Sequence, residues 1–459
     1  SILIANMDDG DDVVLIDSSV TTKVVAHLGD GNDSLTNFGS GIVMAYGDGD
    51  NDQLVGGSAN DLLDGGSGLD VLRGGKGLDT LTGGDHTDAI IWEVGDGQDL
   101  VINGGGANDD ALNILGIDDQ ALQLAVSPNG AGFKVTIGAV TLAVDSIETL
   151  TVEGSNKSDS MTVNDLAASV LRQINLGLGN DSVKDTVTVL GSADNDNYDV
   201  RAATADIPVL GAGGVPNIET VDVMQLNRLS GALINILDAG AASGGDTITL
   251  NTLGGTDTIN ARSTLAGTVT IVDTGDAADT VNVGSPDNKL NGVNGLLDLR
   301  GGAAATGIDT LTVKDSGDTV ANTGQLTSTR ITGLGMGSSN QNAINSALGI
   351  KYGGFEKLDV ALGSAGDVFT IKSTINGPIG LNANGGGDVV NVQTISGVTT
   401  LDSGTGSDTI NVGSNASGAA GSAVAKQNNT GGNVNGIAAA LVINGDAPTS
   451  GSDVLTIDD

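Results

Sequence analysis

Aspartates recur at regular intervals in the first hundred residues, and their spacing suggests columns of metal ligands. They form two series, with Asp33, Asp52, Asp70 and Asp88 in one and Asp61, Asp79 and Asp99 in the other. Successive members of each series lie 18 residues apart or slightly more. If one coil of the chain has this length, each series becomes a column of carboxylates along one edge of the coil. Carboxylate columns repel one another unless cations lie between them. Carboxylates are hard oxygen ligands, which favours calcium.

The aspartates belong to a nine-residue repeat, G-G-x-G-x-D-x-U-x, in which U is a large aliphatic residue. Residues 65–73 and 74–82 match every fixed position, and residues 56–64 and 83–91 match most of them. Weaker copies occupy residues 28–36, 47–55 and 94–102. Glycine turns the chain because it reaches positive φ without a side-chain penalty. The x-U-x segment predicts a short strand whose middle side chain points inward, so two repeats make one coil with strands stacked in parallel.

These loops predict calcium sites in which the aspartate supplies charge and the glycine-rich turn supplies carbonyl oxygens, as at Gly68 and Gly77. Magnesium is less suitable because it requires a strict octahedron and keeps its waters. The alternative is that the aspartates only cap turns through hydrogen bonds to their own backbone. Three copies carry Asp50, Ala59 or His86 in place of the second-turn glycine, which puts the loop geometry there in question.

With these motifs, residues 28–115 resemble the repeats-in-toxin (RTX) calcium-binding β-roll, and residues 65–82 carry the resemblance most specifically. The resemblance implies calcium binding by the repeat aspartates and loop carbonyls, in exported bacterial proteins. The segment IIWEVGDGQDLVINGGG is similar to the end of such arrays, where Trp92 is expected to cap the roll.

Beyond residue 115 the nonapeptide fades, but aspartate followed by alternating aliphatic residues continues. The theme recurs at Asp159, Asp181, Asp246, Asp257, Asp279, Asp309, Asp367, Asp388, Asp408 and Asp453, and a glutamate version at Glu148, Glu219 and Glu356. The intervals from Asp367 to Asp388 and on to Asp408 are longer than those of the nonapeptide array and predict larger coils. This part resembles aspartate-rich parallel β-helix regions of large bacterial surface proteins. Its aspartates are either calcium ligands or turn residues, and both interpretations stay open.

Several local features interrupt this pattern. SPNG at residues 127–130 predicts a turn between two strands, and residues 164–172 suggest a short helix. Residues 332–349 and 414–432 are expected to be polar loops, and the second of these contains the sequons NAS (415–417) and NNT (428–430).

Composition sets the fold class. The 459 residues include 73 glycines and only 2% aromatics, yet 39% are hydrophobic, which favours a thin aliphatic core. We predict an all-β fold, an elongated right-handed parallel β-roll or β-helix (a β-solenoid) along most of the chain. The expected domains are residues 1–115 (RTX-type β-roll), 116–250 (β-solenoid with irregular inserts) and 251–459 (β-solenoid with a long internal repeat). Coils in the last domain are expected to take about twenty to twenty-two residues, a period in the range of solenoid repeats.

Charge and missing residue types exclude several functions. The formal net charge of −39 disfavours nucleic acid and anionic membranes as partners. The chain has no cysteine and no apolar run long enough for a membrane span. Because His27 and His86 are its only histidines, no familiar catalytic relay is expected, and we predict that the chain is not an enzyme.

The function predicted from these features is that of an extracellular structural protein at the bacterial cell surface. In this interpretation a calcium-stabilised rod assembles head-to-tail with copies of itself into a filament or surface layer, since both ends of the sequence have strand-like patterns without a cap. Attachment to the cell surface or to glycans fits the same interpretation. The alternative is a calcium-dependent secretion and folding module, or an adhesin stalk, of a larger exported protein or enzyme.

Overall fold

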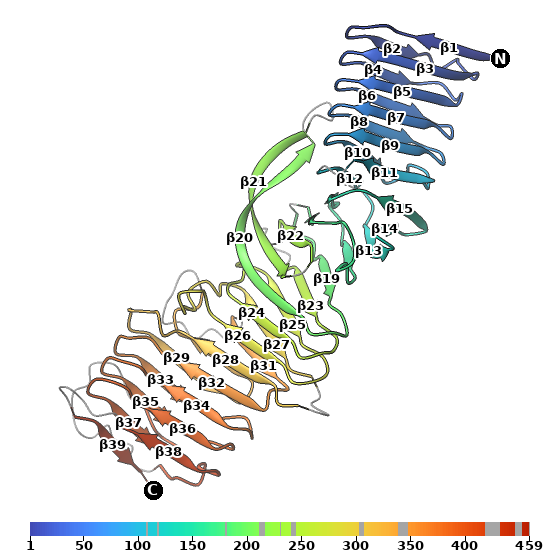
Figure 1. Cartoon of the computed structure of the whole chain (residues 1–459). Helices are drawn as coiled ribbons and strands as arrows, with labels where there is room; N and C mark the ends of the chain where they lie inside the picture. Colours follow the sequence, from blue (N-terminus) through green and yellow to red (C-terminus); the bar gives the residue numbers. More distant parts are fainter. Residues whose placement is uncertain are drawn as a thin grey trace. The chain divides into compact units, whose positions relative to one another are not determined.

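We describe the chain from a computed structural model. It describes residues 1–458 apart from 107–108, 117–118, 180, 211–215, 230, 240–244, 303–306, 338–347, 418–431 and 446–451. The chain divides into two compact units (Figure 1). Unit 1 comprises Ser1–Val189 with Ala203–Gly244, and unit 2 comprises Leu190–Ala202 with Gly245–Asp459. The predicted division into three domains stays a prediction.

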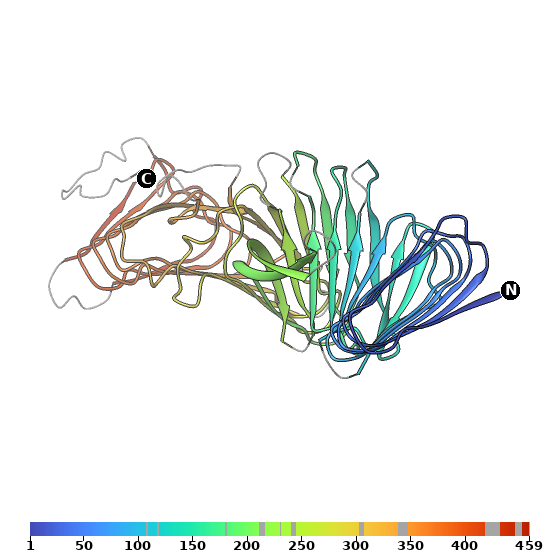
Figure 2. The same cartoon turned by 90° about the horizontal axis from the view of Figure 1, so that it is seen from above.

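Unit 1 is a parallel β-solenoid whose coils alternate between two sheets. One sheet stacks β1 (Ile2–Asn6), β3 (Lys23–Asp30), β5 (Val43–Gly49), β7 (Leu62–Ser67), β9 (Thr80–Asp85), β11 (Val101–Gly105) and β15 (Val140–Asp145). The other stacks β2 (Val13–Ile16), β4 (Ser34–Asn37), β6 (Gln53–Gly57), β8 (Val71–Gly75), β10 (Ala89–Glu93), β12 (Ala111–Leu115), β16 (Thr149–Glu153), β18 (Gln173–Gly177) and β22 (Leu233–Leu237). Seen from above, successive coils of this unit lie over one another as flattened loops (Figure 2).

Unit 2 repeats this architecture. One sheet contains β23 (Thr247–Asn251), β25 (Val269–Asp273), β27 (Leu296–Arg300), β31 (Gly349–Gly353), β33 (Val368–Ile371), β35 (Val389–Val392), β37 (Thr409–Val412) and β39 (Val454–Ile457). The other contains the start of β20 (Asn197–Leu210), then β24 (Thr258–Ala261), β26 (Thr280–Val283), β28 (Thr310–Lys314), β32 (Lys357–Ala361), β34 (Ile379–Asn382), β36 (Thr399–Asp402) and β38 (Leu441–Asn444). The all-β parallel solenoid class is therefore confirmed.

Antiparallel inserts interrupt the parallel sheets. Strands β13 (Gln123–Asn129) and β14 (Gly132–Ile137) form a hairpin that continues antiparallel to β15, and the turn expected near SPNG lies at its tip. Parallel pairing resumes from β13 to β17 (Ser160–Val163) and β19 (Thr186–Leu190). In unit 2 the matching insert is β29 (Thr323–Thr327) with β30 (Arg330–Gly333), beside β31 and β33. The long strand β21 (Pro216–Arg228) pairs antiparallel with β22.

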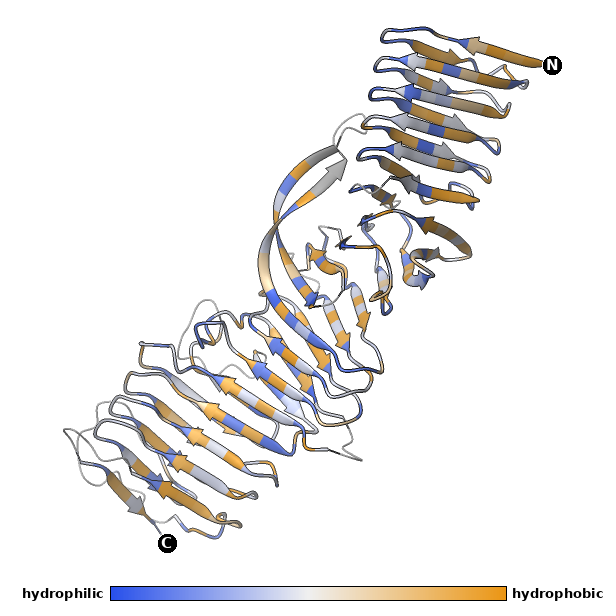
Figure 3. Ribbon diagram, viewed as in Figure 1, coloured by the Kyte–Doolittle hydropathy of each residue, from blue (hydrophilic) through white to orange (hydrophobic). Residues whose placement is uncertain are grey.

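The core is a single file of aliphatic side chains in each sheet, as the repeat predicts. The second residue after most repeat aspartates, such as Leu54, Leu63, Leu72 and Leu81, is fully buried. Leu54 pairs with Leu72 on the next coil, and Leu63 pairs with Leu81, so each coil of the array consists of two nonapeptides. Hydrophobic and hydrophilic residues alternate along these strands (Figure 3).

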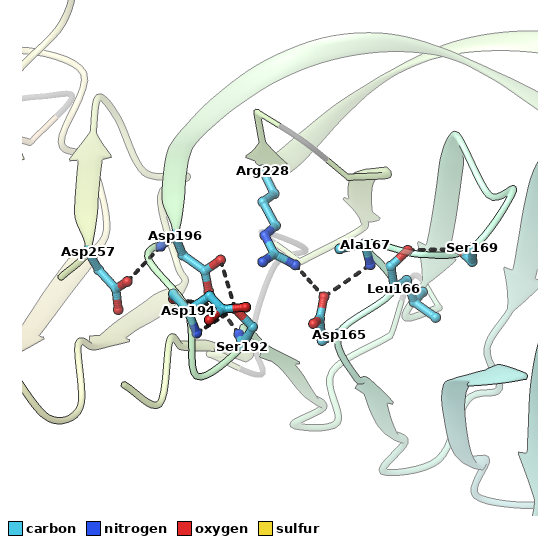
Figure 4. A network of polar contacts seen from close by, with 9 residues as sticks. All are labelled: Asp165, Leu166, Ala167, Ser169, Ser192, Asp194, Asp196, Arg228 and Asp257. Carbon is cyan, nitrogen blue, oxygen red and sulfur yellow. Dashed lines mark hydrogen bonds and ion pairs between the residues drawn. The ribbon is translucent and has the colours of Figure 1, made fainter. Parts of the chain in front are cut away.

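Two local expectations are wrong. The described residues contain no helix, and residues 164–172 form turns. Asp165 starts a turn by accepting a hydrogen bond from the Ala167 amide at 3.0 Å, and it pairs with Arg228 (Figure 4). Trp92 does not cap the roll, because its strand β10 pairs with β8 on one edge and with β12 on the other. Its indole instead donates to the Gly97 carbonyl at 2.9 Å from a buried position within the stack.

Other expectations fall partly outside the described residues. Most of the predicted polar loops, namely residues 338–347 and 418–431, and the sequon at 428–430 lie there.

Candidate metal centre

Most of the loops before the repeat aspartates share one backbone conformation. The residues four and two positions before the aspartate have positive φ, as in Gly66 (104°) and Gly68 (156°) before Asp70. Gly75 (86°) and Gly77 (144°) precede Asp79 in the same way. Two residues with positive φ therefore define the shape of each of these loops.

The substituted loops keep part of this conformation. Asp50 and His86, which replace the second glycine, still adopt positive φ of 65° and 78°. Aspartate and histidine enter this region more readily than most residues. Their loops therefore keep the turn, whereas Ala59 is not among the residues with positive φ.

Successive loops stack in direct backbone contact. A Cβ atom added to Gly68 would lie 1.9 Å from the Asp50 carbonyl oxygen, and one added to Gly77 would lie 2.1 Å from that of Ala59. Only glycine fits at these positions. The stacked loops bring carbonyl oxygens and repeat aspartates of neighbouring coils together along each edge.

The aspartates form a hydrogen-bonded ladder between coils. The backbone N–H of Asp52 donates to Oδ1 of Asp70 at 2.8 Å, and that of Asp70 donates to Oδ1 of Asp88 at 2.9 Å. On the other edge the Asp61 amide donates to Asp79 at 2.7 Å, and the Asp79 amide to Asp99 at 3.4 Å. These bonds join different coils, so the aspartates do more than cap their own turns.

The second carboxylate oxygen of most of these aspartates is buried without a hydrogen-bond partner. This holds for Oδ2 of Asp33, Asp52, Asp61, Asp70, Asp79 and Asp88. Oδ2 of Asp70 faces the backbone of Gly65, since a Cβ added to that glycine would lie 2.4 Å from it. A buried carboxylate oxygen without a partner lowers the stability of the folded state, so each of these oxygens favours protonation or the binding of a cation.

The nonapeptide loops match a known family of repeats. The RTX calcium-binding nonapeptide repeat, taken as four copies, matches residues 46–81 and 64–97. Residues 46–97 are RTX repeats. Such repeats bind calcium and occur in secreted bacterial proteins, where the β-roll is a structural domain and not typically a catalytic one. No curated protein matched the chain. Within the described residues, no helix has the length and apolar character that a membrane crossing needs.

The ladder extends beyond the matched RTX repeats at both ends. The Asp12 amide donates to Asp33 at 2.7 Å, and the Asp88 amide donates to Asp110 at 2.8 Å. The Asp110 amide in turn donates to the Glu148 carboxylate at 3.0 Å. Asp110 was missed from the sequence because its interval from Asp88 exceeds two nonapeptides and its loop lacks the full glycine pattern. Its signal was only the aliphatic alternation that follows it.

Burial perturbs the acidity of the RTX aspartates. Desolvation is the largest cause in each case, and it raises the pKa of Asp61 and Asp70 to about 6 and that of Asp52 and Asp79 to about 7. The same cause raises the pKa of Asp88 to about 8. Neighbouring ladder carboxylates add to the rise in several of them, while the hydrogen bond from the adjoining amide opposes it. At neutral pH the metal-free ladder would therefore be partly protonated.

The donor set of the RTX loops fits calcium if backbone carbonyl oxygens supplement the carboxylates. Among the described residues, no three acidic or histidine side chains gather closely enough to hold a metal ion by themselves. An ion between two coils would have to combine one or two carboxylates with several backbone carbonyls. Calcium accepts such mixed sets of six to eight oxygens.

A second class of ladder aspartate has both oxygens satisfied. Oδ2 of Asp159 accepts a hydrogen bond from the Ser155 amide at 2.7 Å. In the same way Oδ2 of Asp196 accepts one from the Ser192 amide at 2.8 Å, as Figure 4 shows. Oδ2 of Asp367 accepts from the Gly363 amide at 2.9 Å. These aspartates act as structural caps, whereas Oδ2 is without a partner in the RTX loops of Asp52, Asp61, Asp70, Asp79 and Asp88.

Proposed function

We propose that this chain is a calcium-stabilised structural part of an exported bacterial protein. The observation that carries the proposal is the column of buried, unpartnered Oδ2 atoms in the stacked RTX loops. The ligands would be the following: Asp33, Asp52, Asp61, Asp70, Asp79, Asp88 and Asp99, with the carbonyl oxygens of Gly68 and Gly77. Bound calcium would supply positive charge between carboxylates that otherwise repel one another.

A structural role also agrees with the two histidines. The His27 ring stacks on Tyr46 with ring centroids 4.6 Å apart and lies 3.6 Å from a carboxylate oxygen of Asp48, and the exposed His86 ring contacts the Asp85 carbonyl of its own loop. None of these contacts brings either ring to a serine hydroxyl. We therefore propose a non-enzymatic role outside the cell, where millimolar calcium suits weak extracellular sites.

Calcium binding is tested by equilibrium dialysis and far-ultraviolet circular dichroism on the whole chain. We expect bound calcium to increase the β signal, and we expect D70N/D79N/D88N to lose bound ions, because an amide replaces the free oxygen in each loop. The matched control is Asp85→Asn, which changes an exposed aspartate in the same loop as Asp88 and should bind like the wild type. A chain that is fully folded in excess chelator and binds no calcium would overturn the proposal.

We further propose that copies assemble head-to-tail through their first and last strands. Ile2, Leu3 and Ile4 of β1 are 60%, 52% and 70% exposed, and Leu455 and Ile457 of β39 are 51% and 62% exposed. Each strand pairs on one edge only among the described residues, with β3 and with β37 respectively. In the proposal, β39 of one copy continues the sheet that starts at β1 of the next, which gives an open filament or a surface layer.

Assembly is tested by electron microscopy and sedimentation of the chain in millimolar calcium and in chelator. We expect filaments or sheets in calcium and their loss in chelator. The variant L3K/L455K should assemble less at unchanged thermal stability, because charged side chains block edge pairing. Dispersed monomers in millimolar calcium would contradict assembly without contradicting calcium binding.

A further inference from the structure

Four loops of unit 2, outside the matched RTX repeats, have the RTX backbone conformation. In each, the residues four and two positions before an aspartate have positive φ. The pairs are Leu253 (69°) and Gly255 (101°) before Asp257, Gly275 (79°) and Ala277 (99°) before Asp279, Asn384 (63°) and Gly386 (125°) before Asp388, and Gly404 (77°) and Gly406 (145°) before Asp408. The glycine pattern that defines the nonapeptide is absent from most of them, so a sequence comparison does not detect the shared geometry.

These loops also stack as RTX loops do. In unit 1 the Lys76 amide donates to the Gly57 carbonyl of the preceding coil at 2.9 Å. The equivalent bonds in unit 2 run from the Asp276 amide to the Leu253 carbonyl at 3.0 Å, and from the Thr405 amide to the Asn384 carbonyl at 2.8 Å. The donor is three positions before its repeat aspartate and the acceptor is four positions before its own in all three cases. The four loops therefore form two stacked pairs.

Each stacked pair carries two ladder aspartates with a free oxygen. The Asp257 amide donates to Oδ1 of Asp279 at 2.8 Å, and the Asp388 amide donates to Oδ1 of Asp408 at 2.8 Å. All four side chains are at most 1% exposed, and Oδ2 of each has no hydrogen-bond partner. The nearby Thr252 hydroxyl donates to the Thr274 carbonyl at 2.9 Å. A buried, unpartnered carboxylate oxygen in every loop is an observation independent of the backbone conformation.

Two of the loops keep this conformation against steric preference. Leu253 and Ala277 have positive φ although side chains with a Cβ disfavour it. Strain of this kind persists only where surrounding structure imposes it, and it is frequent at ligand sites. Each of these two loops thus reproduces with one glycine the backbone that RTX loops obtain with two.

We propose that unit 2 binds calcium at two further places. One lies between loops 253–257 and 275–279 on the edge before β24 and β26, and the other lies between loops 384–388 and 404–408 on the edge before β35 and β37. Each site would take two carboxylates and several loop carbonyls, the donor set of the RTX loops. The proposal rests on calcium binding by those loops, but it concerns residues that no family comparison reaches.

The experiment uses the whole chain and measures two quantities. Equilibrium dialysis counts bound calcium, and hydrogen–deuterium exchange with mass spectrometry locates calcium-dependent protection. In the wild type, calcium should slow exchange at residues 253–258 and 384–389 as well as at 66–79. D257N/D279N/D388N/D408N should lose about two bound ions per chain, one for each mixed carboxylate and carbonyl site. It should also lose protection in unit 2 alone.

The matched control is D196N/D367N. These two ladder aspartates accept a backbone amide at Oδ2, so the control should keep all bound calcium even if its stability falls. Calcium that protects residues 66–79 but not the two unit 2 segments of the wild type would overturn the inference, whether or not the variants fold. Calcium that protects neither unit would overturn the proposed function itself.

Discussion

In the presence of a chelator, the chain should melt at a higher temperature at pH 5.5 than at pH 8. Burial raises the pKa of ladder aspartates from the model-compound value of 3.8 to about 7 for Asp52 and Asp79 and to about 8 for Asp88. Between these values the folded state holds more protons than the unfolded state. The stability from protonated carboxylates is therefore fully present below pH 3.8 and is lost as pH rises through 6 to 8.

Calcium should reverse this loss, because it occupies the oxygens that protons would otherwise neutralise. Calcium at about 100 times its dissociation constant stabilises the folded state by about 2.7 kcal/mol per site. Several sites would raise the melting temperature by about 10 °C or more for a unit of this size. We expect most of that rise at pH 8 and little of it at pH 5.5, measured by differential scanning calorimetry at both pH values.

The control for this pH dependence is the ladder variant D52N/D79N/D88N. Low pH also relieves repulsion among the other acidic residues of a chain with net charge −39. Asparagine cannot titrate, so the part of the pH dependence that comes from the ladder should vanish in the variant while the general part remains. A variant with the same pH dependence as the wild type would show that the buried carboxylates do not control stability.

The sequence predicts the coil because the determinants of the coil are local and repeated. Period-two alternation places Leu63 and Leu72 inward, and the spacing of two nonapeptides sets which coil each strand pairs with. The same spacing brings Asp52, Asp70 and Asp88 to one edge. These features depend on residues within one or two repeats, so they can be read without knowledge of the rest of the chain.

What could not be predicted depends on contacts between distant segments. Trp92 was expected to end the roll, but β12 continues the sheet beside its strand, and the next coil along β11 is supplied by β15 after an insert. The helix expected at residues 164–172 gives way to turns, in the segment that joins β17 to β18, and Leu166 and Leu171 are buried there. Which aspartates keep a free oxygen likewise depends on whether an amide such as that of Ser155 or Ser192 turns toward the carboxylate.

Gly84→Ala should be among the most destabilising single substitutions in the RTX loops. The added Cβ would lie 2.0 Å from the Gly66 carbonyl oxygen of the preceding coil, and it would stand on a residue with φ of 125°. The atoms that it meets belong to the backbone and not to a flexible side chain, so two stacked coils must move apart. Separation would break the hydrogen bonds of the ladder, and it would also move apart the calcium ligands that neighbouring coils contribute. We expect a loss of about 3 kcal/mol or more, as for other substitutions that combine a clash with backbone strain.

The effect of the clash can be separated from that of the backbone conformation with Gly10→Ala. Gly10 has φ of 119°, close to that of Gly84, but a Cβ added to it would meet nothing within 4 Å. This control should cost only the conformational penalty of about 1 to 2 kcal/mol. Urea denaturation of both variants in saturating calcium measures the difference. Equal losses in the two variants would mean that the coils yield easily at the loops, and the close backbone stacking would then not be what holds the ligands of neighbouring coils together.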